Sequence, residues 1–225
     1  MGTSERQARE FMCEIGKKLV DVGMVAANDG NITVQLGPDE FLATPASVSK
    51  AFMTPEMICK VDLAGNVIAA EPGVKPTSEL PMHLRVYKAA PDVGAVLHAH
   101  PVYATVFAIK GEALNGRMLP ESVIHMPEVP LAEYGTPSTD AVADGIVPVV
   151  KTHRGCLMES HGALTWGLDL MAAYLNMERL EYMAKITYLS RQINGERDLP
   201  DAEIERLVAM RGQYGSSFAE DGEES

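Results

Sequence analysis

Apolar residues near the start of the chain recur at the spacing of one helix face: Phe11, Ile15, Leu19 and Val22. Residues three and four positions apart lie on the same side of a helix, so this run predicts an amphipathic helix. Ser4 and Gln7 form a capping-box pair that would begin this helix, and Gly23 offers a stop. The first predicted element is therefore a helix that starts after Ser4 and ends before Gly23.

Two pairs of short, strand-like runs follow this helix. The runs are 32–36 with 40–44, and 58–63 with 67–70. Gly-Pro-Asp separates the first pair and Ala-Gly-Asn separates the second. Such residues between apolar runs are typical of tight turns, so each pair is predicted to form a hairpin.

Helix and strand patterns are mixed in the rest of the chain. Thr77 or Ser78 can cap a helix that ends near Pro91, with Glu79 at its N-terminus. The other predicted elements are a strand over 93–100, a helix over 102–109, a helix from Ser138 or Thr139 to Pro148, a strand pair within 156–166, and a long helix over 169–194. Because this order is mixed, we expect an α/β fold: a single layered domain with a central, mostly antiparallel or mixed sheet flanked by helices.

Length and composition add limits to this picture. With 225 residues, 46% of them hydrophobic, the chain can bury one sizeable core, so we expect a single domain over 1–225 with a flexible acidic tail at about 216–225. A net charge of −12 disfavours nucleic acid as a partner. Without a long apolar stretch or a signal-peptide core, we expect no membrane association and a cytoplasmic location. The scattered thiols are expected to be reduced: Cys13, Cys59 and Cys156.

The candidate chemistry begins with two histidines on the strand predicted over 93–100. His98 and His100 are two residues apart, so their imidazoles project from the same face and could bind one metal ion. Two hydrogen-bonded histidines at a strand end would give the same pattern. The pair alone leaves these interpretations about even, and a third ligand is needed to decide between them.

His161 is the best candidate for that third ligand. It ends a short apolar run, and the glycine that follows it would let another group approach closely. Three histidines leave an open coordination position, which suits a catalytic metal better than a structural one. The other histidines lack a partner at ligand spacing, and we interpret them as residues at the surface or behind the site: His83, His125 and His153.

Two further segments have the composition of an anion site. Residues 27–31 join the first helix to the first strand, and residues 75–79 open a helix whose free amides and hydroxyls favour phosphate. For either segment alone, ordinary turn and cap chemistry is the more probable interpretation. Together they predict a phosphate between them.

Two other metal folds that begin from this histidine pair are disfavoured. Cupins place a glutamate a few residues later, where this chain has the residues Val102 to Thr105. An amidohydrolase barrel needs a much longer chain.

Four motifs occur together in one order: Gly30-Asn31, Thr77-Ser78-Glu79, His98-Ala99-His100 and Ser160-His161-Gly162. In this combination the chain resembles the class II aldolase and adducin family over roughly residues 5 to 195. The resemblance implies one divalent metal ion per subunit. Zinc is the expected ion, and manganese, cobalt and iron are the alternatives. His98, His100, His161 and Glu79 would hold it, and Glu79 would also act as the catalytic acid and base.

The resemblance also implies where the substrate phosphate binds and how the chains assemble. The matching positions are Gly30, Asn31, Ala46, Ser47, Thr77 and Ser78, and at Ala46-Ser47 the chain departs from the family's Thr-Gly pair. Family members are homotetramers with sites at subunit interfaces. A second acid or base comes from a neighbouring subunit's tyrosine, for which Tyr134 and Tyr214 are weak candidates.

The resemblance implies a lyase that cleaves a small phosphorylated sugar. The expected reaction converts a ketose 1-phosphate, such as L-fuculose 1-phosphate or a related deoxy-pentulose 1-phosphate, into dihydroxyacetone phosphate and an aldehyde. Epimerase, methylthioribulose-phosphate dehydratase and oxo-acid phosphate decarboxylase activities occur on the same scaffold, although epimerase relatives tend to carry aspartate at the position of Glu79. A non-catalytic adducin-like module ranks low because such modules lack the three histidines.

Overall fold

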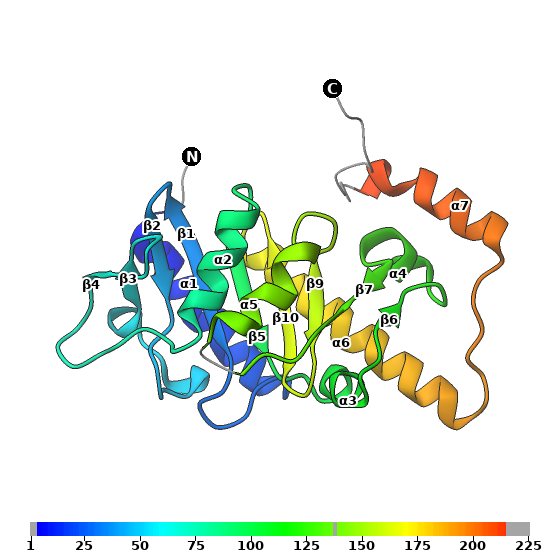
Figure 1. Ribbon diagram of the computed structural model, residues 1–225, viewed down its shortest axis with the longest axis horizontal. Coiled ribbons are helices and arrows are strands. Elements are labelled where there is room, and N and C mark those ends of the chain that lie inside the picture. Colours follow the sequence, from blue (N-terminus) through cyan, green and yellow to red (C-terminus); the bar gives the residue numbers. More distant parts are fainter. Residues whose placement is uncertain (1–3, 137–138, 215–225) are drawn as a thin grey trace.

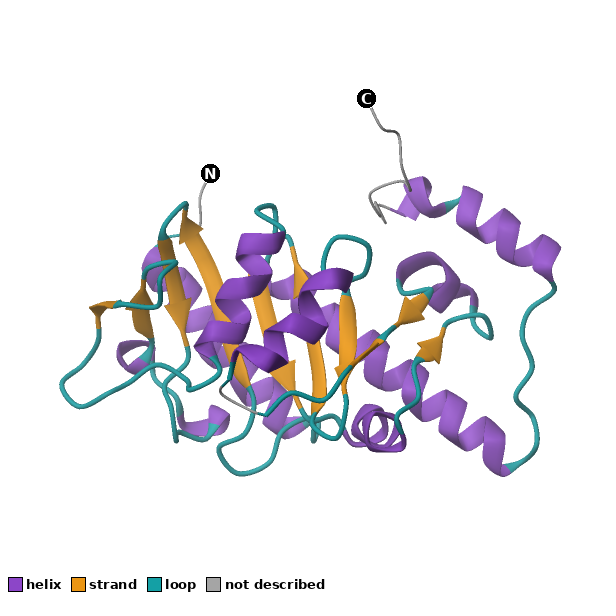
Figure 2. Ribbon diagram, viewed as in Figure 1, coloured by secondary structure: helices purple, strands orange, loops and turns teal. Residues whose placement is uncertain are grey.

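The computed structural model describes residues 4–136 and 139–214 and has an eight-stranded sheet at its centre (Figure 1, Figure 2). Its strands are β1 (Asn31–Gly37), β2 (Glu40–Ala43), β3 (Cys59–Val61), β4 (Val67–Ala69), β5 (Ala95–Ala99), β8 (Leu131–Ala132), β9 (Gly155–Met158) and β10 (Gly162–Gly167). Across the sheet they follow the order β4-β3-β2-β1-β5-β10-β9-β8. Neighbouring strands are antiparallel except β8 and β9, which run parallel, so the sheet is mixed.

Helices cover both faces of this sheet (Figure 1). On one face lie α1 (Glu5–Asp21), α3 (Val102–Lys110) and α6 (Leu170–Gln192), and on the other lie α2 (Leu80–Ala89) and α5 (Asp140–Ile146). Because side chains alternate along a strand, each central strand contributes to two cores. On β5, Leu97 packs with the first group of helices and Val96 with the second. The domain is thus three layers with apolar contacts on both sides of the sheet.

A smaller unit adjoins the parallel edge of the sheet. It contains β6 (Leu114–Asn115), β7 (Glu128–Val129), α4 (Pro120–His125) and α7 (Asp201–Ala209). The segment that enters α7 is tied down by Arg117, which pairs with Asp198 and Asp201. Short 3-10 helices complete the structure: η1 (Lys50–Phe52), η2 (Pro55–Met57), η3 (Val147–Val149) and η4 (Arg211–Tyr214).

Most predicted elements occur where the apolar pattern indicated. The capping box of α1 is present, because the Ser4 side chain accepts from the Gln7 amide and the Gln7 side chain accepts from the Ser4 amide. Both hairpins form, as β1 with β2 and as β3 with β4. The expected α/β fold with a mixed sheet flanked by helices is confirmed.

The predicted start of α2 was wrong by one or two residues. The N-cap residue is Glu79, and neither Thr77 nor Ser78 occupies that position. Instead, the Thr77 hydroxyl accepts from the Glu79 amide at 3.3 Å and holds the turn before the helix. This shift leaves the Glu79 side chain outside the first helical turn, free to point toward other elements.

Some predictions concern residues outside the described part of the chain or were never made. Ser138 and the acidic segment 216–225 lie outside the described residues. The elements β6, β7, β8, α4 and α7 had no predicted counterpart, because runs of two apolar residues and a mostly polar helix give a weak periodic signal. Among the described helices, none combines the length and the apolar composition needed to cross a bilayer.

Candidate metal and anion site

Three imidazoles meet at one end of the central strands. His98 lies on β5, His100 follows it directly, and His161 lies in the turn between β9 and β10. The antiparallel register of β5 with β10 pairs Ala99 with Ala163 and so brings the β9–β10 turn beside His100. The ring centroids lie 4.7 Å apart for His98 and His161, 4.9 Å for His98 and His100, and 5.2 Å for His100 and His161.

The spacing of the ring nitrogens fits one divalent ion. One ligand nitrogen from each of the three histidines lies within 4.8 Å of the others, and His98 Nε2 is 3.0 Å from His100 Nε2. Tetrahedral zinc with metal–nitrogen distances near 2.0–2.1 Å requires ligand nitrogens about 3.3 Å apart. The described residues therefore supply three nitrogens close enough together to share one such ion.

Neighbouring groups orient two of these rings. His98 Nδ1 lies 2.9 Å from the carbonyl oxygen of Ala163, and a ring N–H that donates there leaves the Nε2 lone pair for a metal. Asp29 Oδ2 lies 3.5 Å from His100 Nδ1 and favours the corresponding orientation of that ring. His161 Nδ1 is buried and has no hydrogen-bond partner among the described residues.

The electrostatics also favour neutral, metal-binding imidazoles. Burial lowers the pKa of His98 to about 4, with the nearby Glu79 carboxylate acting in the opposite direction. Burial likewise lowers the pKa of His161. At neutral pH both rings are therefore uncharged, which is the form that coordinates a metal ion.

Glu79 lies against two of the three imidazoles. Its Oε2 is 3.4 Å from His98 Nε2 and its Oε1 is 3.5 Å from His161 Nε2. Asn31 Nδ2 donates to Oε2 at 2.7 Å and fixes the carboxylate, because β1 pairs with β5 so that Asn31 stands opposite His98. Burial opposes the charge on Glu79, but His98 and His161, in the states in which those rings are protonated, and the hydrogen bond from the Asn31 amide outweigh it and lower the pKa of Glu79.

The predicted anion segments converge beside this cluster. Pro45 bridges to Pro76, the Thr77 amide donates to the Thr44 carbonyl at 2.9 Å, and the Ala46 amide donates to the Lys75 carbonyl at 2.9 Å. The Thr44 hydroxyl also accepts from the Ile32 amide at 3.1 Å. Residues 44–47 are thereby linked both to the start of β1 and to the segment that opens α2.

The individual phosphate candidates differ in exposure and backbone shape. Gly30, Asn31 and Thr77 are buried, whereas Ser47 and Ser78 are exposed and Ala46 is intermediate. Gly30 has φ of 73°, a conformation that glycine adopts without strain, and a Cβ there would lie 2.6 Å from Val25 Cγ1. Ser47 has φ of 60° without being glycine, so the turn holds it in an unusual conformation.

The surroundings of three residues near the site are visible only in the folded chain. Of the two expected places for His83, at the surface or behind the site, the fold excludes the surface: the residue is fully buried, and its Nδ1 lies 2.9 Å from the Thr33 hydroxyl, which also bonds Tyr87. Asp29 lies in the predicted anion segment 27–31 without a role of its own, and no role was predicted for Lys50. Only the folded chain shows that Lys50 is buried and that Asp29 faces His100.

The two tyrosine candidates lie apart from each other. The backbone amide of Tyr134 donates to the carboxylate of Glu159, two residues before His161, and its own side chain is exposed. Tyr214 stands edge-on to His125, with ring centroids 6.5 Å apart. Within the described residues of one chain, no hydrogen bond or ring contact joins either tyrosine ring to the three imidazoles.

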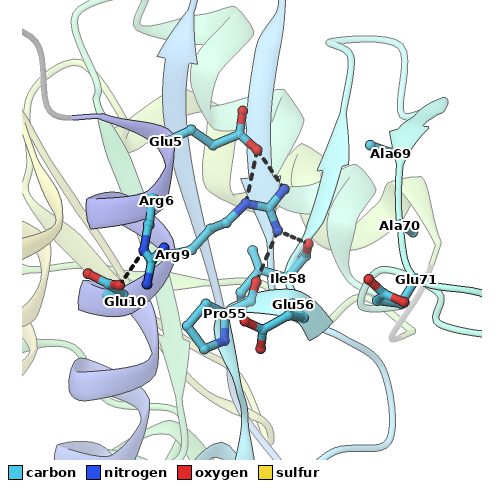
Figure 3. Close-up of a pocket in the computed structure, with 10 residues that line it drawn as sticks. All are labelled: Glu5, Arg6, Arg9, Glu10, Pro55, Glu56, Ile58, Ala69, Ala70 and Glu71. Atoms are coloured by element: carbon cyan, nitrogen blue, oxygen red, sulfur yellow. Dashed lines mark hydrogen bonds and ion pairs between the residues drawn. The ribbon is translucent and has the colours of Figure 1, made fainter.

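A cavity away from the histidine cluster has a different character (Figure 3). It has a volume of about 570 Å³ and lies between α1, η2 and the segment after β4, so none of the residues above lines it. Its arginines are already engaged: Arg9 bonds Glu5 and the carbonyls of Pro55 and Ile58, and Arg6 pairs with Glu10. Both arginines that line this cavity are thus occupied by contacts within the protein.

Comparison with known proteins adds a family assignment. The profile described as "Class II Aldolase and Adducin N-terminal domain" matches residues 10–188. An L-fuculose phosphate aldolase of Methanococcus maripaludis is 30% identical over 184 residues, which is 82% of this chain and 97% of that protein. A 5-deoxy-D-ribulose 1-phosphate aldolase of Bacillus thuringiensis serovar kurstaki is 30% identical, covering 93% of this chain and 98% of the other.

Not every similar protein is an aldolase by name. A 3-oxo-tetronate 4-phosphate decarboxylase of Pectobacterium atrosepticum is 29% identical, covering 83% of this chain and 86% of that protein. Among solved structures, an L-fuculose 1-phosphate aldolase superposes with a TM-score of 0.83 at 30% identity, covering 93% of this chain and 97% of that chain.

Proposed function

The chain belongs to the class II aldolase and adducin family, whose similar members are lyases, and we propose that it cleaves a ketose 1-phosphate to dihydroxyacetone phosphate and an aldehyde. L-fuculose 1-phosphate and related deoxy-pentulose 1-phosphates are the proposed substrates. The observation that carries this proposal is the Glu79 carboxylate, which lies within 3.5 Å of two clustered imidazoles beside converging anion segments.

We propose that His98, His100 and His161 hold the metal, with Glu79 beside it. Zinc is the proposed ion because three imidazoles and one open position are typical of catalytic zinc sites. When bound, it would supply a Lewis acid for the ketone end of the substrate. The hydrogen bond to Ala163 and the Asp29 carboxylate would hold two of the rings in their coordinating orientation.

Glu79 is the proposed acid and base at the reacting carbon. Breaking the C3–C4 bond leaves an electron pair on C3, and Glu79 would deliver a proton there after its carboxylate has taken one up from solvent. Asn31 would keep the carboxylate aimed, because its amide donates to Oε2 at 2.7 Å. The proton of the C4 hydroxyl must leave through a second group, for which we propose a tyrosine from a neighbouring subunit.

The phosphate is proposed to bind where residues 30–31, 46–47 and 77–78 converge. Backbone amides and hydroxyl groups in these segments are suitable donors to phosphate oxygens. Replacement of the family's Thr-Gly pair by Ala46-Ser47 moves a hydroxyl by one position, and the exposed Ser47 side chain remains available as a donor. We further propose a homotetramer with its sites at subunit interfaces.

A second candidate function is decarboxylation of an oxo-acid phosphate. The similarity to the 3-oxo-tetronate 4-phosphate decarboxylase favours it, since that match covers 83% of this chain, between the 82% and 93% covered by the two aldolases. The two reactions share the need for a metal next to a carbonyl group and differ in the bond that breaks.

The direct test is a substrate panel with metal-loaded protein. We expect dihydroxyacetone phosphate to form from one or more ketose 1-phosphates, measured with a coupled glycerol-phosphate dehydrogenase assay. Carbon dioxide release from an oxo-tetronate phosphate, without triose phosphate from any ketose, would instead support the decarboxylase. An epimer recovered without cleavage would contradict both.

A further inference from the structure

Lys50 is a buried lysine at the junction of the proposed phosphate segments. Its residue is only 2% exposed, although it begins the short helix η1. Its ammonium group donates to the carbonyl of Asn28 at 3.1 Å and to the carbonyl of Val48 at 2.9 Å. One of these carbonyls belongs to the loop that leads to Gly30 and the other to the loop that holds Ser47, so Nζ bridges both loops.

This buried cation lacks a direct anionic partner. Among residues 4–136 and 139–214, no carboxylate forms an ion pair with Lys50, and both of its bonded acceptors are neutral carbonyls. A buried charge without a counter-charge is costly, commonly by several kcal/mol. A bound anion would offset that cost.

The lysine still carries its charge near neutral pH. Burial lowers its pKa to about 8, and the carboxylate of Asp29 acts in the opposite direction. An ammonium group has three N–H donors, of which the two carbonyls take two. One donor and the positive charge therefore remain for an additional acceptor.

We propose that the Lys50 ammonium is the positive charge that holds the substrate's phosphate, acting from beneath the loops 27–31 and 46–49. This inference rests on the proposed function for the identity of the phosphate ester, but it makes a claim about anion binding that needs no turnover. It also explains why hydroxyl and amide donors suffice at the surface of the site: the charge comes from a buried side chain. The competing interpretation is that Lys50 only links the two loops through its hydrogen bonds.

The test is a phosphate titration of the full chain by isothermal titration calorimetry, with Lys50→Met as the principal variant. Methionine has a similar length and no charge, so the core should tolerate it. A charge-assisted hydrogen bond to an anion is worth roughly 1.5–3 kcal/mol, so the dissociation constant for inorganic phosphate should rise about 10- to 100-fold. Lys17→Met is the matched control, because Lys17 is exposed on α1, and it should change that constant less than about twofold.

A second variant separates the role of the Lys50 charge from the role of its hydrogen bonds in linking the two loops. Lys50→Gln keeps an N–H donor but removes the charge, so it should lose phosphate affinity as Lys50→Met does. Metal affinity, measured by chelator competition, should stay unchanged in both variants, because the proposal involves only the anion. Native phosphate affinity in Lys50→Gln would overturn the proposal. A parallel loss of metal affinity, through the Asp29–His100 contact, would also overturn it, because either result would show that Lys50 only links the two loops.

The proposal can fail independently of the proposed reaction. A native protein that binds no phosphate at millimolar concentration overturns the role of Lys50 even if it cleaves a ketose phosphate. Conversely, a chain without aldolase activity that binds phosphate through Lys50 keeps this inference and loses only the proposed reaction. Circular dichroism melting of each variant establishes that folded protein is being compared.

Discussion

At the scale of single residues, the Glu79 side chain is constrained by three elements other than its own helix. It is the N-cap residue of α2, yet its side chain caps nothing in that helix. Instead, the carboxylate contacts His98, His161 and the amide of Asn31. A residue released from helix capping and held by three other elements is suited to proton transfer at a bound substrate.

Replacing Glu79 by glutamine should abolish turnover while leaving metal in the protein. The amide is nearly isosteric, so the fold and the three imidazoles should persist, but it cannot carry a proton as a carboxyl group does. We expect kcat to fall at least about 100-fold, the lower end for loss of a general acid–base group. Steady-state kinetics and elemental analysis of the same sample would check this.

A His98→Ala variant serves as the opposite control. It should lose bound metal by elemental analysis, because it removes the fully buried imidazole at the centre of the cluster. Full activity in Glu79→Gln would exclude the proposed role of Glu79, and unchanged metal content in His98→Ala would exclude the histidine cluster as the metal centre.

At the scale of elements, the site depends on how closely β10 approaches β5. Gly162 begins β10 directly after His161, and a Cβ there would lie 2.6 Å from the carbonyl oxygen of Ala99 and 2.7 Å from His100 Cδ2. Ser160, which precedes His161 in the same turn, has φ of 56°, so the turn contains a residue in the left-handed conformation. The absence of a side chain at Gly162 therefore allows the turn to bring His161 against His100.

Gly162→Ala should weaken both folding and metal binding. The added methyl group must push the two strands apart, which costs about 1–3 kcal/mol for overpacking in a tight core. Urea unfolding and chelator competition would measure the two effects. Gly37→Ala is the matched control, because a Cβ at Gly37 meets no atom within 4 Å, and its effect should stay within about 0.5 kcal/mol. Equal behaviour of the two variants would contradict the close-approach argument.

At the scale of the whole molecule, the outer face of α6 carries exposed apolar side chains. Leu175, Tyr182 and Leu189 recur every seven residues, and Met171 and Ile193 extend the row. Monomeric proteins rarely expose large contiguous apolar patches. This face supports the proposed homotetramer, because a neighbouring subunit would remove it from water.

Tyr182→Glu should reduce the assembly size if this face lies between subunits. A buried carboxylate in an apolar contact is costly, so the mass from light scattering should fall from that of four chains. Ile68→Glu provides the control, because Ile68 is a similarly exposed apolar residue on β4 at the other end of the sheet. An unchanged mass in Tyr182→Glu would place the subunit contacts elsewhere.

The sequence by itself determined the local part of this description. Side-chain periodicity is set by backbone geometry, so the spacing of Phe11, Ile15 and Leu19 predicted α1, and the two-residue spacing of His98 and His100 predicted that their rings share a face. The turn residues predicted both hairpins, because turn conformation is also a local property of the backbone. The N-terminal boundary of α2 and the short elements around α4 were not predicted correctly, because tertiary contacts decide them.

The tertiary structure alone decided which distant residues meet. Strand register places Asn31 opposite His98 and brings His161 to His100, and no local pattern contains a register between strands far apart in the chain. Burial also depends on the whole fold: no local pattern marks Lys50 as buried, yet it lies at 2% exposure between two loops. The sequence thus supplied the candidate side chains, and non-local packing decided which of them meet.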